Sequence, residues 1–232
     1  MLGLAPGVTV VDVGTGTGFA ALAVDRSAGT RVLGVDRSPA MISVARERAE
    51  AAGWGGAVTF AVGDAHQLGV RDERADAVMF VTSLHYMTPA RALAEARRTV
   101  RPGGTVAVGA LATGALAPSA LFREVLAEHG VEAPDRMAGT GSREHLTALL
   151  DGARLGQVKI GRDTLRLGDG DLGDAWVVNL TMAARRLADW TEAEVAALRE
   201  RWEARVAAAR AVDEEGFRTV TMLMARARRP DW

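Results

Sequence analysis

The 232-residue sequence contains no cysteine, and it has one lysine and one tyrosine. Without cysteine there is no disulfide framework, no thiolate metal site and no cysteine nucleophile. The single lysine, Lys159, lies in the strand-like segment VKIG, which disfavours Schiff-base chemistry. The formal net charge of -1 excludes the basic excess expected of a protein that binds nucleic acid or an anionic membrane.

Long apolar runs are also absent. No segment approaches the length needed to cross a bilayer, and the N-terminus lacks the plan of a secretion signal. Hydrophobic residues make up 48% and charged residues 25%, which is typical of globular proteins. We therefore expect a cytoplasmic protein, and the alanine- and arginine-rich usage favours a GC-rich bacterial gene.

The first half alternates short apolar runs with helical patterns. The runs are apolar nearly throughout, as expected of parallel strands that are covered on both faces, and they span residues 8–13, 30–36, 57–64, 75–82 and 104–111. This alternation predicts an α/β fold with a doubly wound, mostly parallel, seven-stranded Rossmann-like sheet.

Residues typical of helix starts and ends indicate helices between these strands. Ser38-Pro39 predicts a helix start and Gly53 its end, and Thr88-Pro89 predicts a second start. Residues 101–104, with the sequence RPGG, predict a turn into the next strand. The first of these helices shows a three- and four-residue spacing, mostly apolar, over Met41, Val44, Ala45, Arg48 and Ala52.

The second half has more helix. Ser142 predicts a helix cap, residues 156–167 a strand, and the pair Thr191 and Glu194 a capping box. Tryptophans in the helical stretches, Trp176, Trp190 and Trp202, are expected in the core. We expect one domain over residues 1–232, with a cofactor-binding core at 1–112 and helical segments at 113–140 and 170–212 that form a substrate lid.

The most glycine-dense segment is VVDVGTGTGFA, residues 10–20. A glycine loop between a strand and a helix presents backbone N–H groups to a ligand at the carboxyl end of the strand. The dinucleotide fingerprint requires a third glycine at position 19, but that residue is Phe19 and the third glycine is Gly18. Asp12 beside the loop opposes a pyrophosphate and suits a ligand that carries positive charge.

Two further carboxylates follow neighbouring strands. Asp36 ends the second strand, where a carboxylate can accept both hydroxyls of a ribose, and Asp64 follows the third. A ribose, a positive charge and no phosphate describe S-adenosylmethionine (SAM) better than a nicotinamide nucleotide.

The sequence resembles the class I SAM-dependent methyltransferases, in the small-molecule branch that contains methyltransferase type 11 and the quinone-biosynthesis enzymes. Five blocks carry the resemblance in the family's order: DVGTGTG from Asp12, VDRSPAM from Val35, GDAH from Gly63, DAVMFVTSLHYM from Asp76 and RPGGTVAV from Arg101. Together they cover nearly the whole first half of the chain.

The resemblance implies roles for residues in these blocks. Asp12 and the loop hold the methionine part of SAM, Asp36 binds the ribose, and Arg37 and Met41 lie against the adenine. Asp64 and Ala65 reach the adenine amino group, with His66 beside the adenine, and residues 81–83 line the methyl-donor side. The implied cofactor-binding set is Asp12, Gly14, Thr15, Gly16, Gly18, Asp36, Arg37, Met41, Asp64, Ala65, His66, Val81, Thr82 and Ser83. The product is S-adenosylhomocysteine (SAH).

Catalytic candidates follow the fourth strand. His85 can act as a general base for the acceptor, or it can brace the loop, and Tyr86 can position a substrate or pack. The four histidines have no carboxylate partners at ligand spacing, so we expect no metal site.

Two other classes of function stay open. One is a non-methylating enzyme of natural-product biosynthesis, such as a cyclase or decarboxylase, which would have the same cofactor site. The other is a nicotinamide-dependent oxidoreductase, which Phe19 and the acidic strand ends oppose. A small organic methyl acceptor, in secondary metabolism, is favoured over nucleic acid, protein or membrane, but fold does not choose between O-, N- and C-methylation.

Overall fold

The structure is a computed structural model that describes residues 7–24, 29–54 and 56–231. The chain divides into two compact units. The first, called the sheet unit, comprises residues 1–110, 139–162 and 223–232. The second, called the helical unit, comprises residues 111–138 and 163–222. The segments predicted as a lid, 113–140 and 170–212, fall largely in the helical unit, and their role as a cover stays a prediction.

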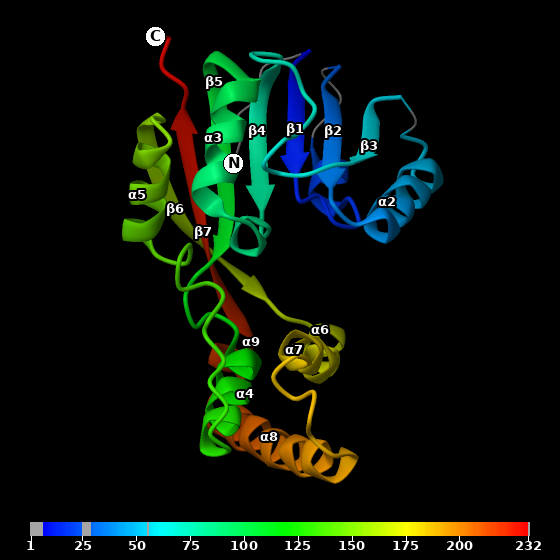
Figure 1. The fold of residues 1–232 in the computed structure, drawn as a ribbon, viewed down its shortest axis with the longest axis vertical. Helices are drawn as coiled ribbons and strands as arrows, with labels where there is room; N and C mark the ends of the chain where they lie inside the picture. Colours follow the sequence, from blue (N-terminus) through cyan, green and yellow to red (C-terminus); the bar gives the residue numbers. More distant parts are fainter. Residues whose placement is uncertain (1–6, 25–28, 55, 232) are drawn as a thin grey trace. The chain divides into compact units, whose positions relative to one another are not determined.

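Seven strands form one sheet in the order β3-β2-β1-β4-β5-β7-β6 (Figure 1). Their bounds are β1 Thr9–Val13, β2 Arg31–Asp36, β3 Val58–Val62, β4 Ala75–Val81, β5 Val100–Leu111, β6 Gly156–Arg166 and β7 Thr219–Arg228. The pairs from β3 through β5 are all parallel. The predicted fold class, a mostly parallel seven-stranded Rossmann-like sheet, is confirmed.

Several helices of the sheet unit begin at the residues predicted to start them. The helices of this unit are α1 Phe19–Ala23, α2 Pro39–Ala51, the short 3₁₀ helix η1 Leu84–Tyr86, α3 Pro89–Thr99 and α5 Arg143–Gly152. The Ser38 hydroxyl accepts from the Met41 N–H, and the Ser142 hydroxyl accepts from the His145 N–H. Both predicted N-caps are therefore confirmed, because each side chain satisfies an N–H group that the helix itself leaves unpaired.

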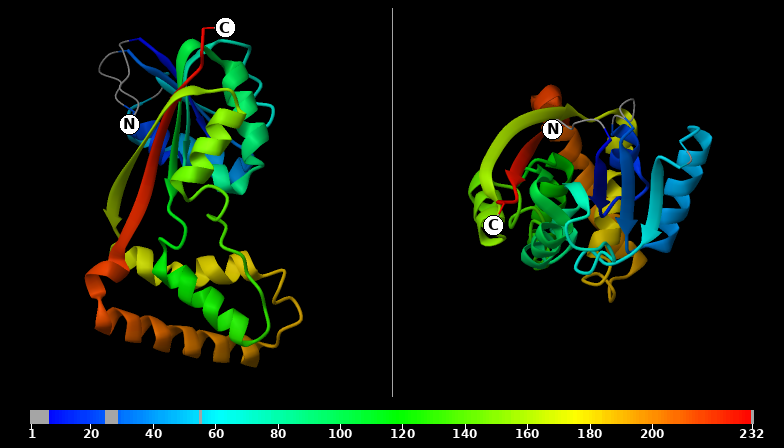
Figure 2. Two further views of the ribbon diagram at one scale, coloured as in Figure 1. Left: turned by 90° about the vertical axis from the view of Figure 1, so that its left-hand side faces the viewer. Right: turned by 90° about the horizontal axis from the view of Figure 1, so that it is seen from above.

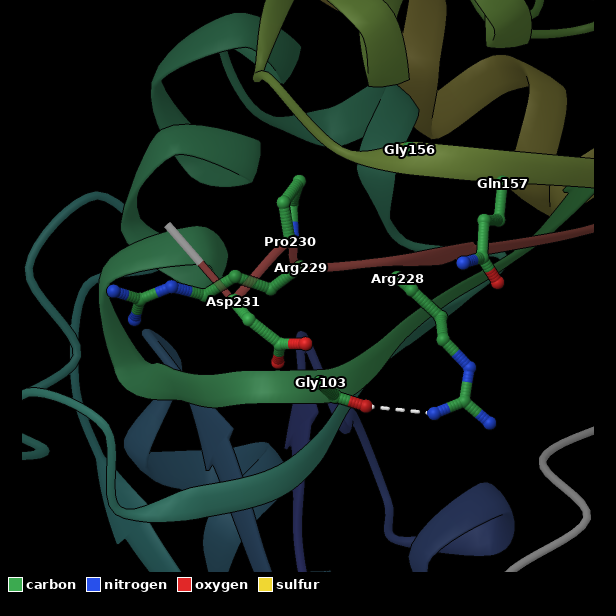
Figure 3. Close-up of a pocket in the computed structure, with 7 residues that line it drawn as sticks. All are labelled: Gly103, Gly156, Gln157, Arg228, Arg229, Pro230 and Asp231. Carbon is green, nitrogen blue, oxygen red and sulfur yellow. Dashed lines mark hydrogen bonds between the residues drawn. The ribbon is translucent and has the colours of Figure 1, made fainter.

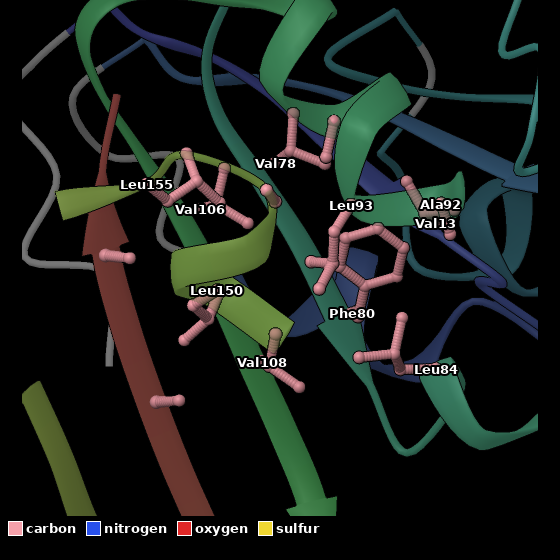
Figure 4. Close-up of a cluster of buried hydrophobic side chains, with 14 of the residues drawn as sticks. Val13, Val78, Phe80, Leu84, Ala92, Leu93, Val106, Val108, Leu150 and Leu155 are labelled. Atoms are coloured by element: carbon pink, nitrogen blue, oxygen red, sulfur yellow. The ribbon is translucent and has the colours of Figure 1, made fainter. Parts of the chain in front are cut away.

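The sheet is buried on both faces because successive side chains along each strand point to opposite sides. Val10, Ala77 and Ala107 pack with residues of α1 and α2. Val13, Val78 and Val106 pack with residues of α3 and α5 (Figure 4). Figure 2 shows α3 and α5 together on one side of the sheet. Continuous apolar strand sequences follow directly from this double coverage.

One local prediction is wrong, and one sequence pattern differs from the buried face of its helix. Residues 101–104 do not form a turn but belong to β5, because the Gly103 N–H donates to Arg229 O and the Arg229 N–H donates to Gly104 O. The buried face of α2 is Ile42, Ala45 and Ala49, whereas Met41 is 44% exposed. The apolar spacing noted in the sequence shares Ala45 with this buried face, whereas Met41 and Val44 lie outside it.

The helical unit has its own core. Its helices are α4 Ala117–Glu128, α6 Asp169–Gly173, α7 Ala175–Ala183, α8 Glu192–Val212 and α9 Glu214–Arg218. Phe122, Trp176 and Trp202 are buried together, and the Trp202 Nε1–H donates to Pro118 O at 2.9 Å. Trp190 packs against this cluster, so the core position predicted for the tryptophans is confirmed.

The capping box at the start of α8 is also present, with the Glu194 carboxylate accepting from the Thr191 N–H at 2.8 Å. Within the described ranges, no helix is long and apolar enough to cross a membrane.

Candidate functional site

The glycine loop between β1 and α1 has three glycines in the left-handed region, with φ of 69° at Gly14, 54° at Gly16 and 85° at Gly18. A Cβ at Gly14 would lie 2.6 Å from Ser83 Cβ, and one at Gly18 would lie 2.9 Å from Phe60 Cζ. A Cβ at Gly16 would meet nothing within 4 Å. Protein packing therefore explains the first and third glycines, whereas Gly16 presents bare backbone to open space.

Asp12 supports this loop from inside the protein. It is 1% exposed, and its Oδ2 accepts from the Thr15 hydroxyl at 2.6 Å. Burial, reinforced by the like charge of Asp36, raises the pKa of Asp12 to about 6, even though the Thr15 hydroxyl favours the ionised form. Sequence reasoning placed Asp12 at the loop but did not foresee its burial. Its contact with the methionine part of SAM stays a prediction.

Asp36, at the end of β2, also contacts the loop. Its Oδ2 accepts from the Gly16 N–H at 2.9 Å, and its Oδ1 accepts from the Ser38 N–H at 2.9 Å. A carboxylate oxygen can accept two hydrogen bonds, so each oxygen of Asp36 can still accept one further donor. The two adjacent hydroxyl groups of a ribose could donate to these two remaining acceptor positions.

Apolar side chains are exposed next to these carboxylates. Met41 on α2 is 44% exposed, and Val62, which pairs with Asp36 in the sheet, is 52% exposed. Asp64 follows Val62 by two residues, its side chain largely exposed. The His66 backbone N–H, as the largest influence, holds the pKa of the Asp64 carboxyl below its usual value. An apolar surface between two carboxylates suits a flat aromatic base with an amino group.

Sequence reasoning missed Val62. The sequence did offer one indication, because Val62 is the last apolar residue of the third strand, just as Asp36 is the last residue of the second. Ala65 packs against the core formed with α3 and α5, and Arg37 is exposed. Contacts of Arg37, Met41 and Ala65 with adenine stay predictions.

His66 is engaged on both ring nitrogens by the protein. Its Nδ1 lies 2.8 Å from Asp64 Oδ1, and its Nε2 accepts from the Thr88 N–H at 3.1 Å. A polar contact from His66 to a ligand would therefore break one of these bonds, and only the ring faces are available for the predicted position beside adenine.

The end of β4 is tied to the end of β1. The Ser83 hydroxyl, which is buried, donates to Val13 O at 2.6 Å, directly before Gly14. Thr82 has a φ of 51°, which is rare for a β-branched residue, and its N–H donates to Gly109 O at 2.7 Å. Val81 is the last residue of β4. Of the predicted set Val81, Thr82 and Ser83, Ser83 therefore lies against the glycine loop, and the contact of all three with SAM stays a prediction.

His85 and Tyr86 follow in η1. Their ring centroids are 4.0 Å apart, and Tyr86 is 53% exposed while His85 is half-buried. His85 and Tyr86 follow Ser83, which contacts the loop, by two and three residues. A base role for His85 and a positioning role for Tyr86 stay predictions.

Sequence reasoning also missed Arg48. Its guanidinium donates to the Thr17 hydroxyl at 2.6 Å and lies 4.1 Å from the Phe19 ring centroid. It therefore braces the outer half of the loop from α2. Nothing in the spacing that included Arg48 indicated this role, because the contact crosses 31 residues.

No group of three or more histidine, aspartate and glutamate side chains suited to a metal ion is found in the part of the chain that the structure describes. A pocket of about 360 Å³ lies elsewhere in the sheet unit, where β5 begins and β7 ends (Figure 3). It is lined by Gly103, Gly156, Gln157, Arg228, Arg229, Pro230 and Asp231. None of these is a predicted site residue, because the pocket is at the amino end of β5 and the predicted residues are at carboxyl ends of strands.

Comparison with known proteins identifies the family of the first half of the chain. Residues 11–108 match a family described as a methyltransferase domain. These residues form a class I SAM-dependent methyltransferase domain. It contains every predicted site residue, from Asp12 to Tyr86.

Two curated relatives share this methyltransferase domain. The arsenite methyltransferase of Halobacterium salinarum is 31% identical over 193 residues, which cover 79% of this chain and 48% of that protein. The ubiquinone/menaquinone biosynthesis C-methyltransferase UbiE of Acidiphilium cryptum is 40% identical over 100 residues, which cover 43% of this chain and 40% of that protein. The chain spans less than half the length of either relative.

Among solved structures, the (4+2)-cyclase SpnF is similar over 98% of this chain and 77% of that chain, with a TM-score of 0.58 and 26% identity. This similarity extends through both units, whereas the match to the methyltransferase domain ends at residue 108.

Proposed function

We propose that this chain binds SAM at the carboxyl ends of β1, β2 and β3 and transfers the methyl group to an oxygen, nitrogen or carbon nucleophile of a small organic molecule. The observation that carries the proposal is the pair of carboxylates, Asp36 and Asp64, at the ends of adjacent strands. Exposed Met41 and Val62 lie beside them, and the bare backbone of Gly16 lies next to Asp36.

The residues present fit the cofactor. The remaining acceptor capacity of Asp36 takes the two ribose hydroxyls, and Asp64 Oδ2 takes the amino group of adenine. Met41 and Val62 give the base an apolar contact surface, and the ionised form of Asp12 balances the positive charge of the methionine part. When bound, SAM would supply both the electrophilic methyl group and its leaving group.

The chain's own part in the reaction is then mainly alignment. Holding two reactants in a productive geometry contributes on the order of 7–11 kcal/mol in favourable intramolecular reactions. A base is optional for a good nucleophile, and His85 is our candidate where the acceptor carries a proton to be removed. Tyr86 is our candidate for orienting that acceptor.

We assign the choice of acceptor to the helical unit, and we place the reaction in bacterial secondary metabolism in the cytoplasm. Support for a role of the helical unit comes from the similarity to SpnF, which covers the helical segments as well as the sheet. A soft ion such as arsenite, the substrate named for one relative, is a poor match, because the sequence has no cysteine to supply thiolate ligands.

A second candidate function is cyclisation without methyl transfer. The named activity of SpnF favours it specifically, since that protein is similar over nearly the whole chain. Incubation with SAM and the acceptor separates the two functions, because methyl transfer releases one SAH per turnover and cyclisation releases none.

The cofactor site is tested by titration calorimetry with SAM and SAH, with NAD as the competing ligand class. We expect micromolar affinity for SAM and SAH and no heat with NAD. Asp36→Ala removes the ribose acceptor and should weaken binding at least about tenfold, since hydrogen bonds to charged groups contribute about 1.5–3 kcal/mol. Asp151→Ala, which removes an exposed carboxylate from α5, is the matched control and should bind as the wild type does. Binding of NAD, or an Asp36→Ala variant with unchanged affinity, contradicts the proposal.

A further inference from the structure

The side chain of His66 joins two segments of the sheet unit that are separate in the sequence. One is the segment after β3, which carries Asp64. The other is the start of α3, where Thr88 is the N-cap residue. The ring lies between them, with Nδ1 at 2.8 Å from Asp64 Oδ1 and Nε2 at 3.1 Å from the Thr88 nitrogen.

These contacts fix the state of the imidazole. A backbone N–H can only donate, so the His66 Nε2 that faces Thr88 must carry a lone pair. The ring hydrogen is therefore on Nδ1, where it points to the Asp64 carboxylate. Because Nε2 is occupied, this aspartate–histidine pair is not a general base in this arrangement.

The Asp64 carboxylate is oriented by the same residue. Its Oδ1 accepts from both the His66 backbone N–H, at 2.9 Å, and the His66 ring. Among the residues that the structure describes, no hydrogen-bond partner is shown for Asp64 Oδ2. Arg91, on α3, is the other charged group that acts on this carboxylate. His66 therefore presents one carboxylate oxygen outward while it holds the other.

Thr88 is next in the chain to the residues proposed to contact the methyl acceptor. Thr88 directly follows the segment Ser83–Met87, which contains η1 with His85 and Tyr86. The Thr88 hydroxyl makes no capping bond to α3, so the start of that helix depends on other contacts. The bond to His66 is one such contact, and it connects this segment to Asp64.

We propose that His66 is a positioning residue that couples occupancy of the adenine side, at Asp64, to the order of the segment Ser83–Thr88. The inference rests on the proposed function, because it takes Asp64 Oδ2 as the acceptor for the amino group of SAM or SAH. A ligand that hydrogen-bonds to Asp64 restricts the motion of its carboxylate. The His66 ring, which is bonded to that carboxylate, is restricted with it, and so is the Thr88 N–H that donates to the ring. The start of α3 then becomes more ordered when the cofactor is bound.

Two variants separate the ends of this contact. In His66→Asn, the amide nitrogen replaces Nδ1, which keeps the bond to Asp64 and removes the acceptor for Thr88. In His66→Gln, the amide oxygen replaces Nε2, which keeps the acceptor for Thr88 and removes the ring bond to Asp64. His145→Gln, at an exposed position of α5, is the matched control.

The experiment measures SAH affinity by calorimetry and the exchange rate of the Thr88 amide hydrogen by NMR, with and without saturating SAH. In the wild type, we expect SAH to slow Thr88 exchange. In His66→Asn, SAH affinity stays within about threefold and Thr88 exchanges about fivefold faster, since one hydrogen bond is lost. In His66→Gln, Thr88 exchange without ligand is unchanged and SAH affinity falls about fivefold. SAH no longer slows Thr88 exchange in either variant, and His145→Gln behaves as the wild type.

The outcomes are distinguishable. Equal effects of the two His66 variants on both measurements would show general destabilisation and overturn the coupling. So would a wild type that binds SAH with no change at Thr88. A wild type that binds no SAH overturns the proposed function, and the coupling with it.

Discussion

Replacing Asp12 by asparagine tests the electrostatics of the glycine loop. Asp12 is 1% exposed, and its pKa is raised from 3.8 to about 6. A raised carboxyl pKa means that the folded protein binds the proton more tightly than the unfolded chain. The stability that this provides is fully present below pH 3.8 and is lost as the pH rises through about 6.

The magnitude follows from the shift. The rise from 3.8 to about 6 corresponds to about 3 kcal/mol at full ionisation, since one pKa unit is about 1.4 kcal/mol. About half of this is already lost at about pH 5, so the wild type should lose roughly another 1.4 kcal/mol between about pH 5 and pH 7.5. Asp12→Asn keeps an acceptor for the Thr15 hydroxyl and has no charge to titrate.

The assay is urea unfolding of both proteins at pH 5 and pH 7.5. We expect the free energy of unfolding of Asp12→Asn, relative to the wild type, to increase by about 1.4 kcal/mol between the two pH values. A fixed cost of burying the amide cancels in this comparison, because it is the same at both pH values. Parallel pH dependence of the two proteins would refute the account of Asp12 as a buried, destabilising carboxylate. If Asp12 lies beside the methionine part, as we propose, the variant should also bind SAH more weakly at pH 7.5, since it has lost that charge.

Two further predictions concern the loop and the helical unit. Gly18→Ala should destabilise the fold by at least about 2 kcal/mol in urea unfolding, because its Cβ would clash with Phe60. Gly16→Ala should destabilise it by about 1 kcal/mol because of the positive φ, and its main effect should be weaker SAH binding in calorimetry. Equal stability losses with unchanged SAH affinity would contradict this division. Trp202→Phe removes the N–H donor to Pro118 O and should lower the free energy of unfolding by about 1–3 kcal/mol, with SAH affinity retained. Loss of SAH binding by this variant in a folded protein would contradict the assignment of the cofactor site to the sheet unit.

Sequence reasoning succeeded where the structure is determined by neighbours in the chain. The five early strands are continuous apolar runs because both faces of the sheet are covered. Ser38, Ser142 and the Thr191–Glu194 box could be recognised because a cap and its helix are within four residues.

It failed where a contact spans a long stretch of sequence. Residues 101–104 have a turn composition but pair with Arg229, which is more than a hundred residues away. Arg48 and His66 have partners 31 and 22 residues away, and neither could be identified from local spacing. On α2, Met41 is part of the apolar pattern but is exposed, and this residue is also a candidate for contact with adenine. Local pattern and burial therefore disagree at a position with a proposed function.

The independent core of the helical unit has a consequence for how the protein can change. Phe122, Trp176 and Trp202 hold α4, α7 and α8 together, and Arg205 pairs with Glu124 and Glu128 between α8 and α4. Val177 and Val178, on α7, are exposed and contribute little to this core. Substitutions at such positions can accumulate without unfolding the unit. If the helical unit selects the acceptor, as we propose, a mutational library confined to them would change acceptor preference while the inherited scaffold stays intact.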